Sequence, residues 1–496
     1  MIKLNKDEIR DKVYACWIGK NIGGTMGTPT EGAREINNVT GFTSPKGEPL
    51  PNDDLDLQLV WLMAMEDVGP QKLNSHILGE YWLKCITPEW NEYGICKANL
   101  RRGILPPMSG EVFNEKWRNS NGAWIRSEIW ACLAPGLPDT AIKFAVEDAM
   151  VDHGMGEGTY AAVFTAAIES AAFIEHDIRR LIEIGLAKLP PECRTAKTIK
   201  LVCECYDSGM DWVDTRNKVV DYNSDMGWFQ APANIGFVIL GLLYGEGDFK
   251  KSVLRAINCG DDTDCTAATV GALLGIVGGT KNIPEDWKEY IGDKIITISI
   301  GLASTSGTPC PKTCTELTDR VINMIPVVIN SQRREYLHVS GIYPMREKRI
   351  MEYTDGETDY GDEFANLAID SPQNGLKLCN RNGYSYDFDL HYADVRVSYP
   401  DKPFIKPNET ITVELEFTGK MVQTSNLSFN YYPPKGFTCD GPKGRMIYRL
   451  PHDGQPCKIQ FTVTAGEEVE FINKGIVEVV SDNHCICGYL PIIFIG

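Results

Sequence analysis

Three aspartates stand together in the sequence, directly before a stretch of small and apolar residues. Residues 259–265 read Cys-Gly-Asp-Asp-Thr-Asp-Cys, and the small residues that follow are Ala267, Ala268, Gly271, Ala272 and Gly275. This pattern predicts a helix whose first turn is capped by Asp261 or Asp262. Glycine costs about 1 kcal/mol at each interior helix position, so its repetition indicates that another helix approaches closely. Three carboxylates at the start of a buried helix are unfavourable unless cations neutralise them.

A second acidic cluster lies far earlier in the chain. Residues 52–56 read Asn-Asp-Asp-Leu-Asp and open a strongly apolar stretch that reaches Leu62. Here Asn52 or Asp53 is the expected helix cap, and Asp54 is an acidic residue of the first turn. Either cluster by itself is more simply interpreted as a capped helix terminus. Together, on two helices this apolar, they favour a pair of hard cations such as Mg²⁺, which prefer oxygen ligands.

These two stretches resemble the paired metal motifs of a known family, the all-helical ADP-ribosylglycohydrolases of the dinitrogenase-reductase-activating glycohydrolase group. The matching segments are NDDLDLQLVWL and GDDTDCTAATVGALLG. Three further segments resemble family motifs in the same order. They are a glycine-rich segment that ends in a glutamate, an Asn-Gly loop, and an Asp-His pair before an alanine-rich helix, at residues 19–31, 119–126 and 152–173. The resemblance covers roughly residues 8–300 and implies an all-helical domain there.

The resemblance implies two Mg²⁺ ions, with Mn²⁺ or Ca²⁺ as alternatives. By position, the metal ligands are Asn52, Asp53, Asp54, Asp262, Asp264 and Cys265. Cys265 stands where threonine is common, and a thiol suits Mg²⁺ poorly. Either its backbone alone contributes or Thr266 substitutes for it. Asn52 also replaces a usual threonine, although an amide oxygen is an acceptable ligand for a hard cation.

The resemblance also implies which residues act in catalysis and in substrate binding. The catalytic residues are Glu31, Asp53 and Asp262, and Glu31 is expected to work with the attacking water or the metal. The substrate-binding residues are Asn121, Gly122, His153 and Glu157. On position alone, Glu31 is an ordinary exposed glutamate and His153 a structural histidine. Members of the family often carry aspartate three residues before Asn121, and here that position is Arg118, which leaves the usual substrate fit open.

The implied reaction is hydrolysis of an N- or O-glycosidic bond at C1 of a ribose-like sugar. ADP-ribosyl groups, as small molecules or linked to protein, are the leading substrates. Carboxylates near the anomeric carbon would stabilise an oxocarbenium-like transition state. Three alternatives stay open: a furanosidase or nucleoside-type hydrolase with the same metal core, a noncatalytic ADP-ribose- or sugar-binding protein, and a metallophosphatase. The glycine-rich turns lack the P-loop pattern, so no diphosphate-binding loop is predicted.

Bulk properties are those of an ordinary globular protein. Hydrophobic residues make up 43% of the chain and charged residues 23%, and the net charge is −18. This charge argues against nonspecific binding to nucleic acid or to an anionic membrane. The N-terminus does not resemble a secretory signal, and no apolar run is long enough to span a bilayer. The 16 cysteines are therefore expected to be reduced in a cytoplasmic protein. The oligomeric state does not follow from the sequence.

The hydrophobic pattern changes after about residue 330. We expect an all-α catalytic domain over 1–330, an irregular connecting segment over 331–385, and an antiparallel β-sandwich of the immunoglobulin or fibronectin type over 386–496. The last prediction rests on short stretches in which apolar and polar residues alternate, with Pro and Gly turns between them. The expected strands cover residues 390–399, 410–417, 426–431, 446–450, 458–464, 475–480 and 489–495. No motif assigns a role to this β-domain.

Overall fold

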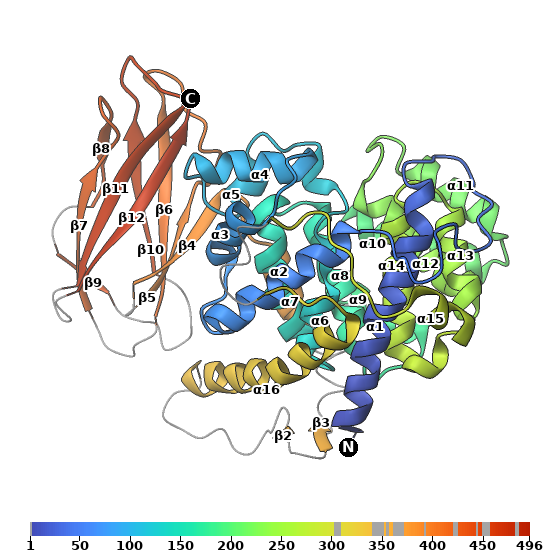
Figure 1. The fold of residues 1–496 in the computed structure, drawn as a ribbon. Helices are drawn as coiled ribbons and strands as arrows, with labels where there is room; N and C mark the ends of the chain where they lie inside the picture. The colour runs from blue at the N-terminus through green and yellow to red at the C-terminus, as the bar shows by residue number, and fades with distance from the viewer. Residues whose placement is uncertain are drawn as a thin grey trace. The chain divides into compact units, whose positions relative to one another are not determined.

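The computed structural model describes most of the chain as two compact units. The described residues are 2–301, 309–339, 352–353, 357–360, 372–390, 393–419, 425–442, 445–448, 457–481 and 486–496. The first unit comprises Met1–Lys97 and Val112–Arg381, and the second comprises Ala98–Glu111 and Asn382–Gly496. The predicted fold class is confirmed, because a helical N-terminal part precedes C-terminal antiparallel strands (Figure 1). The sequence-based boundaries at residues 330 and 385 stay a prediction, and residues 98–111 group with the strands instead.

Helices are the main regular structure of the described N-terminal part. They are α1 (Lys6–Gly27), α2 (Asp53–Val68), α3 (Ser75–Cys85), α4 (Asn91–Arg101), α5 (Met108–Glu111), α6 (Glu128–Leu133), α7 (Pro138–Asp152), α8 (Glu157–Ala171), α9 (Ile178–Leu186), α10 (Arg194–Asp207), α11 (Trp212–Tyr222), α12 (Ala231–Gly245), α13 (Phe249–Asn258), α14 (Thr263–Gly278), α15 (Glu285–Ile291), α16 (Cys314–Val339) and α18 (Pro372–Cys379). Short 3₁₀ turns lie at Thr28–Thr30, Trp117–Asn119, Trp124–Arg126 and Thr280–Asn282. In the described part of the chain, no helix is both long and apolar enough to cross a bilayer.

Helices α1 and α14 pack against each other at backbone distance. A Cβ atom added to Gly19 would lie 2.1 Å from the carbonyl oxygen of Gly271, and one added to Gly23 would lie 2.2 Å from that of Ala267. The close helix–helix approach predicted from the small residues is therefore confirmed. The hydroxyl of Thr263 donates a 2.8 Å hydrogen bond to the carbonyl of Gly27. The end of α1 thus lies against the start of α14, which brings Glu31 to the acidic turn.

A buried polar network fixes the start of α2. Lys20 of α1 donates hydrogen bonds to Glu128 Oε1 at 2.8 Å and to the carbonyl of Ile125 at 2.7 Å. Gln58 of α2 donates to the other carboxylate oxygen of Glu128 at 3.0 Å and accepts from the backbone N–H of Ile129 at 2.8 Å. All of these polar side chains are buried. Helices α1, α2 and α6 are therefore joined beneath the first acidic cluster by satisfied polar groups, the arrangement that a buried charge requires.

The segment expected to be irregular contains regular structure where it is described. Helix α16 continues to Val339 and α18 covers Pro372–Cys379, so residues 331–339 and 372–379 are helical. Strands β2 (Glu352–Tyr353) and β3 (Glu357–Tyr360) form a three-stranded sheet with β1 (Ile2–Asn5), in the order β1-β3-β2. The structure differs from the prediction in these stretches. For residues 331–339 the reason is that α16 continues a helical spacing that Leu317, Val321 and Ile325 begin. Residues 340–351, 354–356 and 361–371 lie outside the described part.

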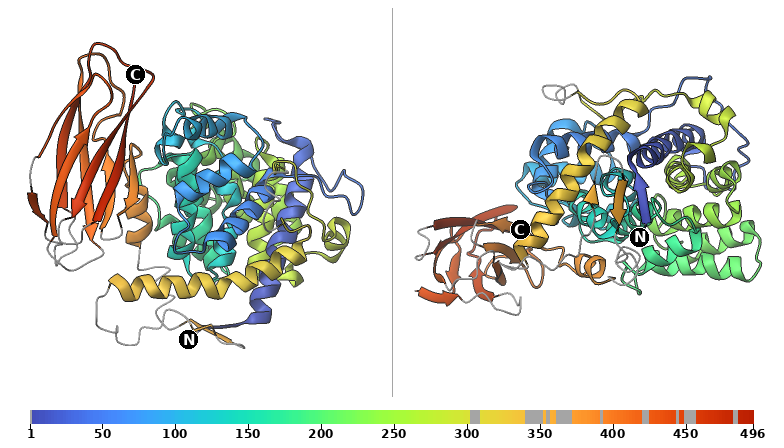
Figure 2. Two further views of the ribbon diagram at one scale, coloured as in Figure 1. Left: turned by 60° about the vertical axis from the view of Figure 1, so that its left-hand side comes forward. Right: turned by 90° about the horizontal axis from the view of Figure 1, so that it is seen from below.

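The C-terminal strands form two antiparallel sheets (Figure 2). One has the order β4-β5-β6-β10-β8 and the other β12-β11-β7-β9. The strands are β4 (Ser385–Asp389), β5 (Ala393–Ser398), β6 (Thr410–Gly419), β7 (Ser425–Tyr432), β8 (Thr438–Asp440), β9 (Arg445–Tyr448), β10 (Cys457–Thr464), β11 (Ile472–Ser481) and β12 (Ile486–Ile495). Phe417 of β6 contacts Phe429 of β7 edge to face at 6.0 Å, so the two sheets share a core. Of the expected strand over 446–450, residues 449–450 lie outside the described part.

Candidate active site and metal centre

The starts of α2 and α14 open into one pocket of about 510 Å³. The end of α1, the loop around residues 117–125 and the Phe229 turn complete its wall. The lining residues are Thr28, Glu31, Leu50, Pro51, Asn52, Asp53, Trp90, Asn91, Glu92, Tyr93, Trp117, Ser120, Asn121, Gly122, Ile125, Phe229, Asp262, Asp264, Cys265 and Ile298. Five of the six predicted metal ligands line this pocket, and the sixth, Asp54, is fully buried beside it.

Two groups of side chains bring potential metal-ligand atoms together. In the first, single ligand atoms of Asp54, Asp264 and Cys265 lie within 4.8 Å of one another. In the second, the same holds for Glu31, Asp262 and Asp264. Asp264 belongs to both groups. Two of the carboxylate oxygens, Asp54 Oδ2 and Asp264 Oδ1, are buried and accept no hydrogen bond among the described residues.

In the second acidic turn, the aspartate side chains do not cap α14 as predicted. Asp262 is the N-cap residue of α14, but its side chain accepts no hydrogen bond from the first turn of the helix. Instead, Asp262 Oδ2 accepts a 2.6 Å hydrogen bond from the amide of Asn121. Asp261 has a positive φ of 69° and accepts hydrogen bonds from the backbone N–H of Phe229 and the amide of Asn234. The side-chain cap prediction was wrong here because both carboxylates accept hydrogen bonds from residues far away in the sequence.

The first acidic turn follows its prediction more closely. Asn52 caps α2, and its side-chain oxygen accepts a 2.7 Å hydrogen bond from the backbone N–H of Asp54. The same amide extends its nitrogen toward Asp264 Oδ2 at 3.5 Å. Asp53 lies outside both ligand groups, although it lines the pocket, and its Oδ2 accepts a 3.1 Å hydrogen bond from the hydroxyl of Tyr93. Asn52 therefore orients the cluster through its amide, and Asp53 points toward the Tyr93 side of the pocket.

Burial and the negative charge of neighbouring carboxylates raise the pKa values of the pocket carboxyls in the metal-free protein. Repulsion from Asp264, followed by partial burial, raises the pKa of Glu31 to about 8. Burial, followed by the charge of Asp264, raises the pKa of Asp53 to about 6 and that of Asp262 well above its usual range. Burial likewise raises the pKa of Asp54, although the nearby Lys20 ammonium opposes the shift. Two carboxyl groups that lie close together repel each other when both are ionised, so without a cation one of them tends to keep its proton.

The Asn121–Gly122 loop is held from beneath by a buried arginine. Arg126 donates to the carbonyl of Gly122 and to the carboxylates of Asp148 and Asp152, and it is fully buried. A Cβ on Gly122 would lie 2.4 Å from Glu92 Oε1, so a larger residue at this position would require the Glu92 side chain to move. The indole of Trp124 donates to Asn121 Oδ1 at 3.0 Å. The loop therefore presents the Asn121 amide to Asp262 in one fixed orientation.

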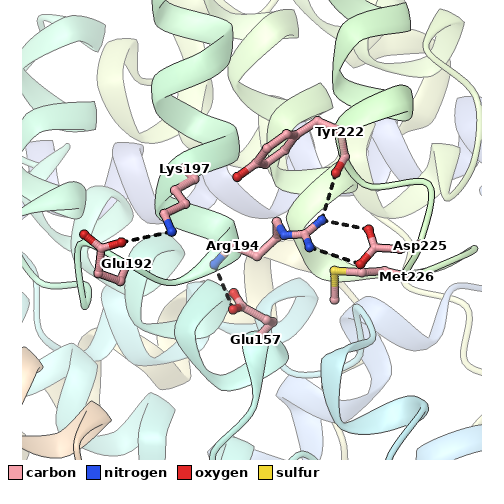
Figure 3. A pocket seen from close by; sticks show the side chains of 7 residues that line it. All are labelled: Glu157, Glu192, Arg194, Lys197, Tyr222, Asp225 and Met226. Atoms are coloured by element: carbon pink, nitrogen blue, oxygen red, sulfur yellow. Dashed lines mark hydrogen bonds and ion pairs between the residues drawn. The ribbon is translucent and has the colours of Figure 1, made fainter.

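The structure places His153 and Glu157 differently from the other predicted site residues. His153 is completely buried behind the loop, with Nε2 3.0 Å from the hydroxyl of Ser120 and Nδ1 3.0 Å from Asp152 Oδ1. Glu157 lines a second cavity of about 480 Å³, with Glu192, Arg194, Lys197, Tyr222, Asp225 and Met226 (Figure 3). Its carboxylate accepts hydrogen bonds from the backbone N–H groups of Arg194 and Thr195 at the start of α10. Neither side chain lines the acidic pocket.

Two pocket-lining residues, Glu92 and Tyr93, and one residue behind the acidic turn, Asn234, had no sequence signal that pointed to the site. Glu92 and Tyr93 lie in the first turn of α4, and burial raises the pKa of Glu92 to about 7. Asn234 of α12 donates to Asp261 and accepts from the backbone N–H of Asp262 at 3.3 Å, so it braces the acidic turn. From the sequence, Asn234 could be interpreted only as a cap. An acidic residue beside an aromatic one at the start of a helix is too common a pattern to indicate a site.

The residues present fit a pair of divalent cations. Unpartnered buried carboxylate oxygens are unfavourable in a protein interior unless a cation lies beside them. The second group offers oxygen ligands only, which suits Mg²⁺, Mn²⁺ or Ca²⁺. The first group adds a sulfur atom to two carboxylates. These acidic groups can therefore hold metal ions, and Asp264 would serve both positions.

The family model of the ADP-ribosylglycohydrolases matches residues 5–315. A search of curated proteins found no match. Among solved structures, a FixG-related protein from Vibrio parahaemolyticus is 11% identical, with a TM-score of 0.18, over 22% of this chain and 97% of that one. A conjugate transposon protein from Bacteroides vulgatus is 17% identical, with a TM-score of 0.17, over 22% and 88% of the two chains. The GAE domain of GGA2p from Saccharomyces cerevisiae is 14% identical, with a TM-score of 0.15, over 23% and 96%.

The family match and the site geometry concern the same part of the molecule. The match spans both acidic turns, Glu31 and the Asn121–Gly122 loop, which are the elements that converge on the pocket. It ends before the C-terminal β-sheets, so it says nothing of residues 316–496. The chain belongs to the ADP-ribosylglycohydrolase family, a family of hydrolases that cleave glycosidic bonds.

Proposed function

We propose that this glycohydrolase depends on divalent cations, with Mg²⁺ as the first candidate, and cleaves an N- or O-glycosidic bond at C1 of a ribose-like sugar. ADP-ribosyl groups are the first candidate substrates, on the strength of the family. The observation that carries the proposal is the convergence of Glu31, Asp262 and Asp264 within 4.8 Å in a pocket large enough for a sugar. Bound cations would supply Lewis-acid contacts to sugar hydroxyls and to a water.

Glu31 is the pocket residue best suited to move a proton. Its side chain is exposed and lines the pocket, and one of its carboxylate oxygens lies within 4.8 Å of ligand atoms of Asp262 and Asp264. Such a carboxyl can accept a proton from an attacking water and stabilise positive charge at the anomeric carbon. Asp262 keeps one oxygen on the Asn121 amide, so its other oxygen has a fixed direction. Asp53, whose Oδ2 accepts a hydrogen bond from the Tyr93 hydroxyl, would contribute negative charge to the same pocket.

The aromatic residues of the pocket could stack against a planar group attached to the sugar. Trp90 is 50% exposed and lies stacked near Tyr93, with ring centroids 6.1 Å apart and planes 27° apart. Phe229, at a positive φ of 55°, lines the same pocket. Flat rings of this kind stack on nucleobases at about 1–3 kcal/mol per base. An adenine or another planar aglycone is therefore compatible with this wall.

A phosphate-free furanoside or nucleoside is the second candidate substrate. Of the pocket-lining residues in the described part of the chain, none is Lys, Arg or His. A diphosphate bound there would meet backbone N–H groups and bound cations but no cationic side chain. This acidic lining is compatible with a neutral glycoside, which needs no cationic side chain. Both candidates share the same bond and the same catalytic residues.

The test compares turnover of matched substrates by the full-length protein. An ADP-ribosylated peptide, a nucleoside, a nitrophenyl furanoside and nitrophenyl phosphate are assayed with Mg²⁺, with Mn²⁺ and with EDTA. We expect cation-dependent hydrolysis of one of the glycosides, and a loss of about 10²–10⁴-fold in Glu31→Gln, the range typical of a positioned acid or base. Glu289→Gln, which changes an exposed glutamate on α15, is the matched control.

Each outcome has a defined meaning. Cleavage of the ADP-ribosylated peptide alone supports the first candidate, and cleavage of the furanoside or nucleoside alone supports the second. Hydrolysis of the phosphate ester, with no glycoside cleaved, overturns the glycosidase proposal. Tight binding of ADP-ribose by the parent protein without turnover of any substrate identifies a noncatalytic binder.

A further inference from the structure

The sulfur of Cys265 is part of the pocket rather than of the surrounding core. Cys265 is buried and lines the pocket, and its thiol donates a 3.3 Å hydrogen bond to Asp54 Oδ1. Its Sγ atom and one carboxylate oxygen each from Asp54 and Asp264 lie within 4.8 Å of one another. Within the described residues this is the ligand group that contains sulfur, whereas the neighbouring group of Glu31, Asp262 and Asp264 contains only carboxylates.

The neighbouring threonines do not take the place of Cys265. The hydroxyl of Thr266 donates back along the helix to the carbonyl of Thr263 at 3.3 Å, and Thr266 does not line the pocket. The hydroxyl of Thr263 donates to the carbonyl of Gly27. Each hydroxyl is directed at a backbone carbonyl, and neither Thr263 nor Thr266 lines the pocket. The ligand atom that the start of α14 offers beside Asp54 and Asp264 is sulfur.

A second observation indicates that this group faces a cation. Asp54 Oδ2 and Asp264 Oδ1 belong to side chains that are 0% and 5% exposed, and neither oxygen has a hydrogen-bond partner among the described residues. Lys20 Nζ lies 4.0 Å from Asp54 Oδ2, beyond hydrogen-bonding distance. This ammonium is already paired with Glu128 at 2.8 Å, so it does not neutralise the two carboxylates. A dication beside Asp54 and Asp264 would balance their two charges.

We propose that the Asp54–Asp264–Cys265 group binds a thiophilic divalent cation of the Zn²⁺ or Co²⁺ type, while the Glu31–Asp262–Asp264 group binds a hard cation such as Mg²⁺. The inference rests on the proposed cation-dependent function and adds that the two ions differ in kind. Thiolate ligands select Zn²⁺ and its relatives, and carboxylates alone select Mg²⁺, Ca²⁺ or Mn²⁺. On binding, the Cys265 thiol releases its proton to solvent and forms the metal–sulfur bond, with no change of oxidation state.

The first test is spectroscopic and does not depend on activity. EDTA-stripped full-length protein is titrated with Co²⁺ under anaerobic conditions. We expect a thiolate-to-cobalt charge-transfer band in the near ultraviolet that saturates at one equivalent. Cys265→Ser keeps a small hydrogen-bond donor but removes sulfur, and it should lose the band. Cys259→Ser is the matched control, because Cys259 is buried at the same turn but belongs to neither ligand group, and it should keep the band.

The second test measures selectivity by equilibrium dialysis against Zn²⁺ in excess Mg²⁺. The parent protein and Cys259→Ser should each retain one Zn²⁺, and Cys265→Ser should bind Zn²⁺ at least about tenfold more weakly. The Mg²⁺-dependent thermal shift should persist in Cys265→Ser, which shows that the variant is folded and that the oxygen site is intact. A parent protein without the cobalt band, or equal Zn²⁺ retention in the parent and Cys265→Ser, overturns the inference. Neither result depends on turnover, so failure of the glycosidase assay stays a separate outcome.

Discussion

Nζ of Lys20 lies 2.8 Å from Oε1 of Glu128, and both side chains are fully buried. Burial alone would lower the pKa of the Lys20 ammonium, but the charges of Glu128 and Asp54 outweigh it and raise that pKa. The same ammonium is 4.0 Å from Asp54 Oδ2, so the pair lies directly beneath the first acidic cluster. The ion pair therefore both joins α1 to α6 and supplies positive charge behind a proposed metal ligand.

Replacing Lys20 by methionine should destabilise the protein strongly. The substitution keeps the length of the side chain but leaves the Glu128 carboxylate buried without its charge partner, an effect worth about 3–5 kcal/mol. The double variant Lys20→Met/Glu128→Gln removes both charges and should recover part of that loss. Denaturant unfolding in EDTA measures both variants. Equal destabilisation of the single and double variants would show that side-chain packing, rather than charge pairing, is what Lys20 contributes.

Asn121→Ala should weaken cation binding without unfolding the protein. The amide holds Asp262 Oδ2 at 2.6 Å, and its loss frees the carboxylate to rotate. Loss of an outer-shell partner of this kind typically costs 10–100-fold in metal affinity or activity, so we expect about that range. A thermal-shift titration with Mg²⁺ gives the affinity. Asn282→Ala, whose amide donates to Leu274 at the other end of α14, is the control and should leave the affinity unchanged.

The sequence predicted the two acidic clusters because their signal is local. A polar turn followed by an apolar helix is visible in a dozen residues, and the small residues of α14 correctly indicated a close neighbour. The long-range partners were not predictable in this way. Asp262 could have capped its own helix, and only the fold brings Asn121 to it from 141 residues away. Glu157 illustrates the converse, since its motif position resembles a site residue but its carboxylate accepts hydrogen bonds from the backbone at the start of α10.

The stability of the metal-free protein should fall as pH rises from about 4.5 to about 8. The pKa of Glu31 rises from 4.5 to about 8 on folding, chiefly through repulsion from Asp264. Between these values the native state binds more protons than the unfolded state, so stability decreases with increasing pH. Melting temperatures in EDTA from about pH 5 to about pH 8.5 test this, and Glu31→Gln should show a shallower decline. Saturating Mg²⁺ should flatten the profile of the parent protein. A decline of equal slope in Glu31→Gln would assign the effect to other groups.

Gly19→Ala should destabilise the protein and impair the pocket at the same time. The added methyl group would lie 2.1 Å from the carbonyl oxygen of Gly271, a distance that forces α1 and α14 apart. Overpacking of this kind typically costs about 1–3 kcal/mol. The same separation moves Glu31, which follows α1, away from Asp264, which opens α14. The Mg²⁺-dependent thermal shift should therefore shrink together with the free energy of unfolding.

Gly41→Ala is the matched control for that substitution. A Cβ atom at Gly41 meets no heavy atom within 4 Å, so the variant should keep both its stability and its response to Mg²⁺. The two measurements separate the possible roles of the helix pair. If Gly19→Ala lowers the free energy of unfolding but leaves the Mg²⁺ response intact, the α1–α14 contact stabilises the fold without setting the geometry of the ligand group. If both fall together, the small-residue contact positions the carboxylates, because it sets the distance between the two helix ends that carry Glu31 and Asp264.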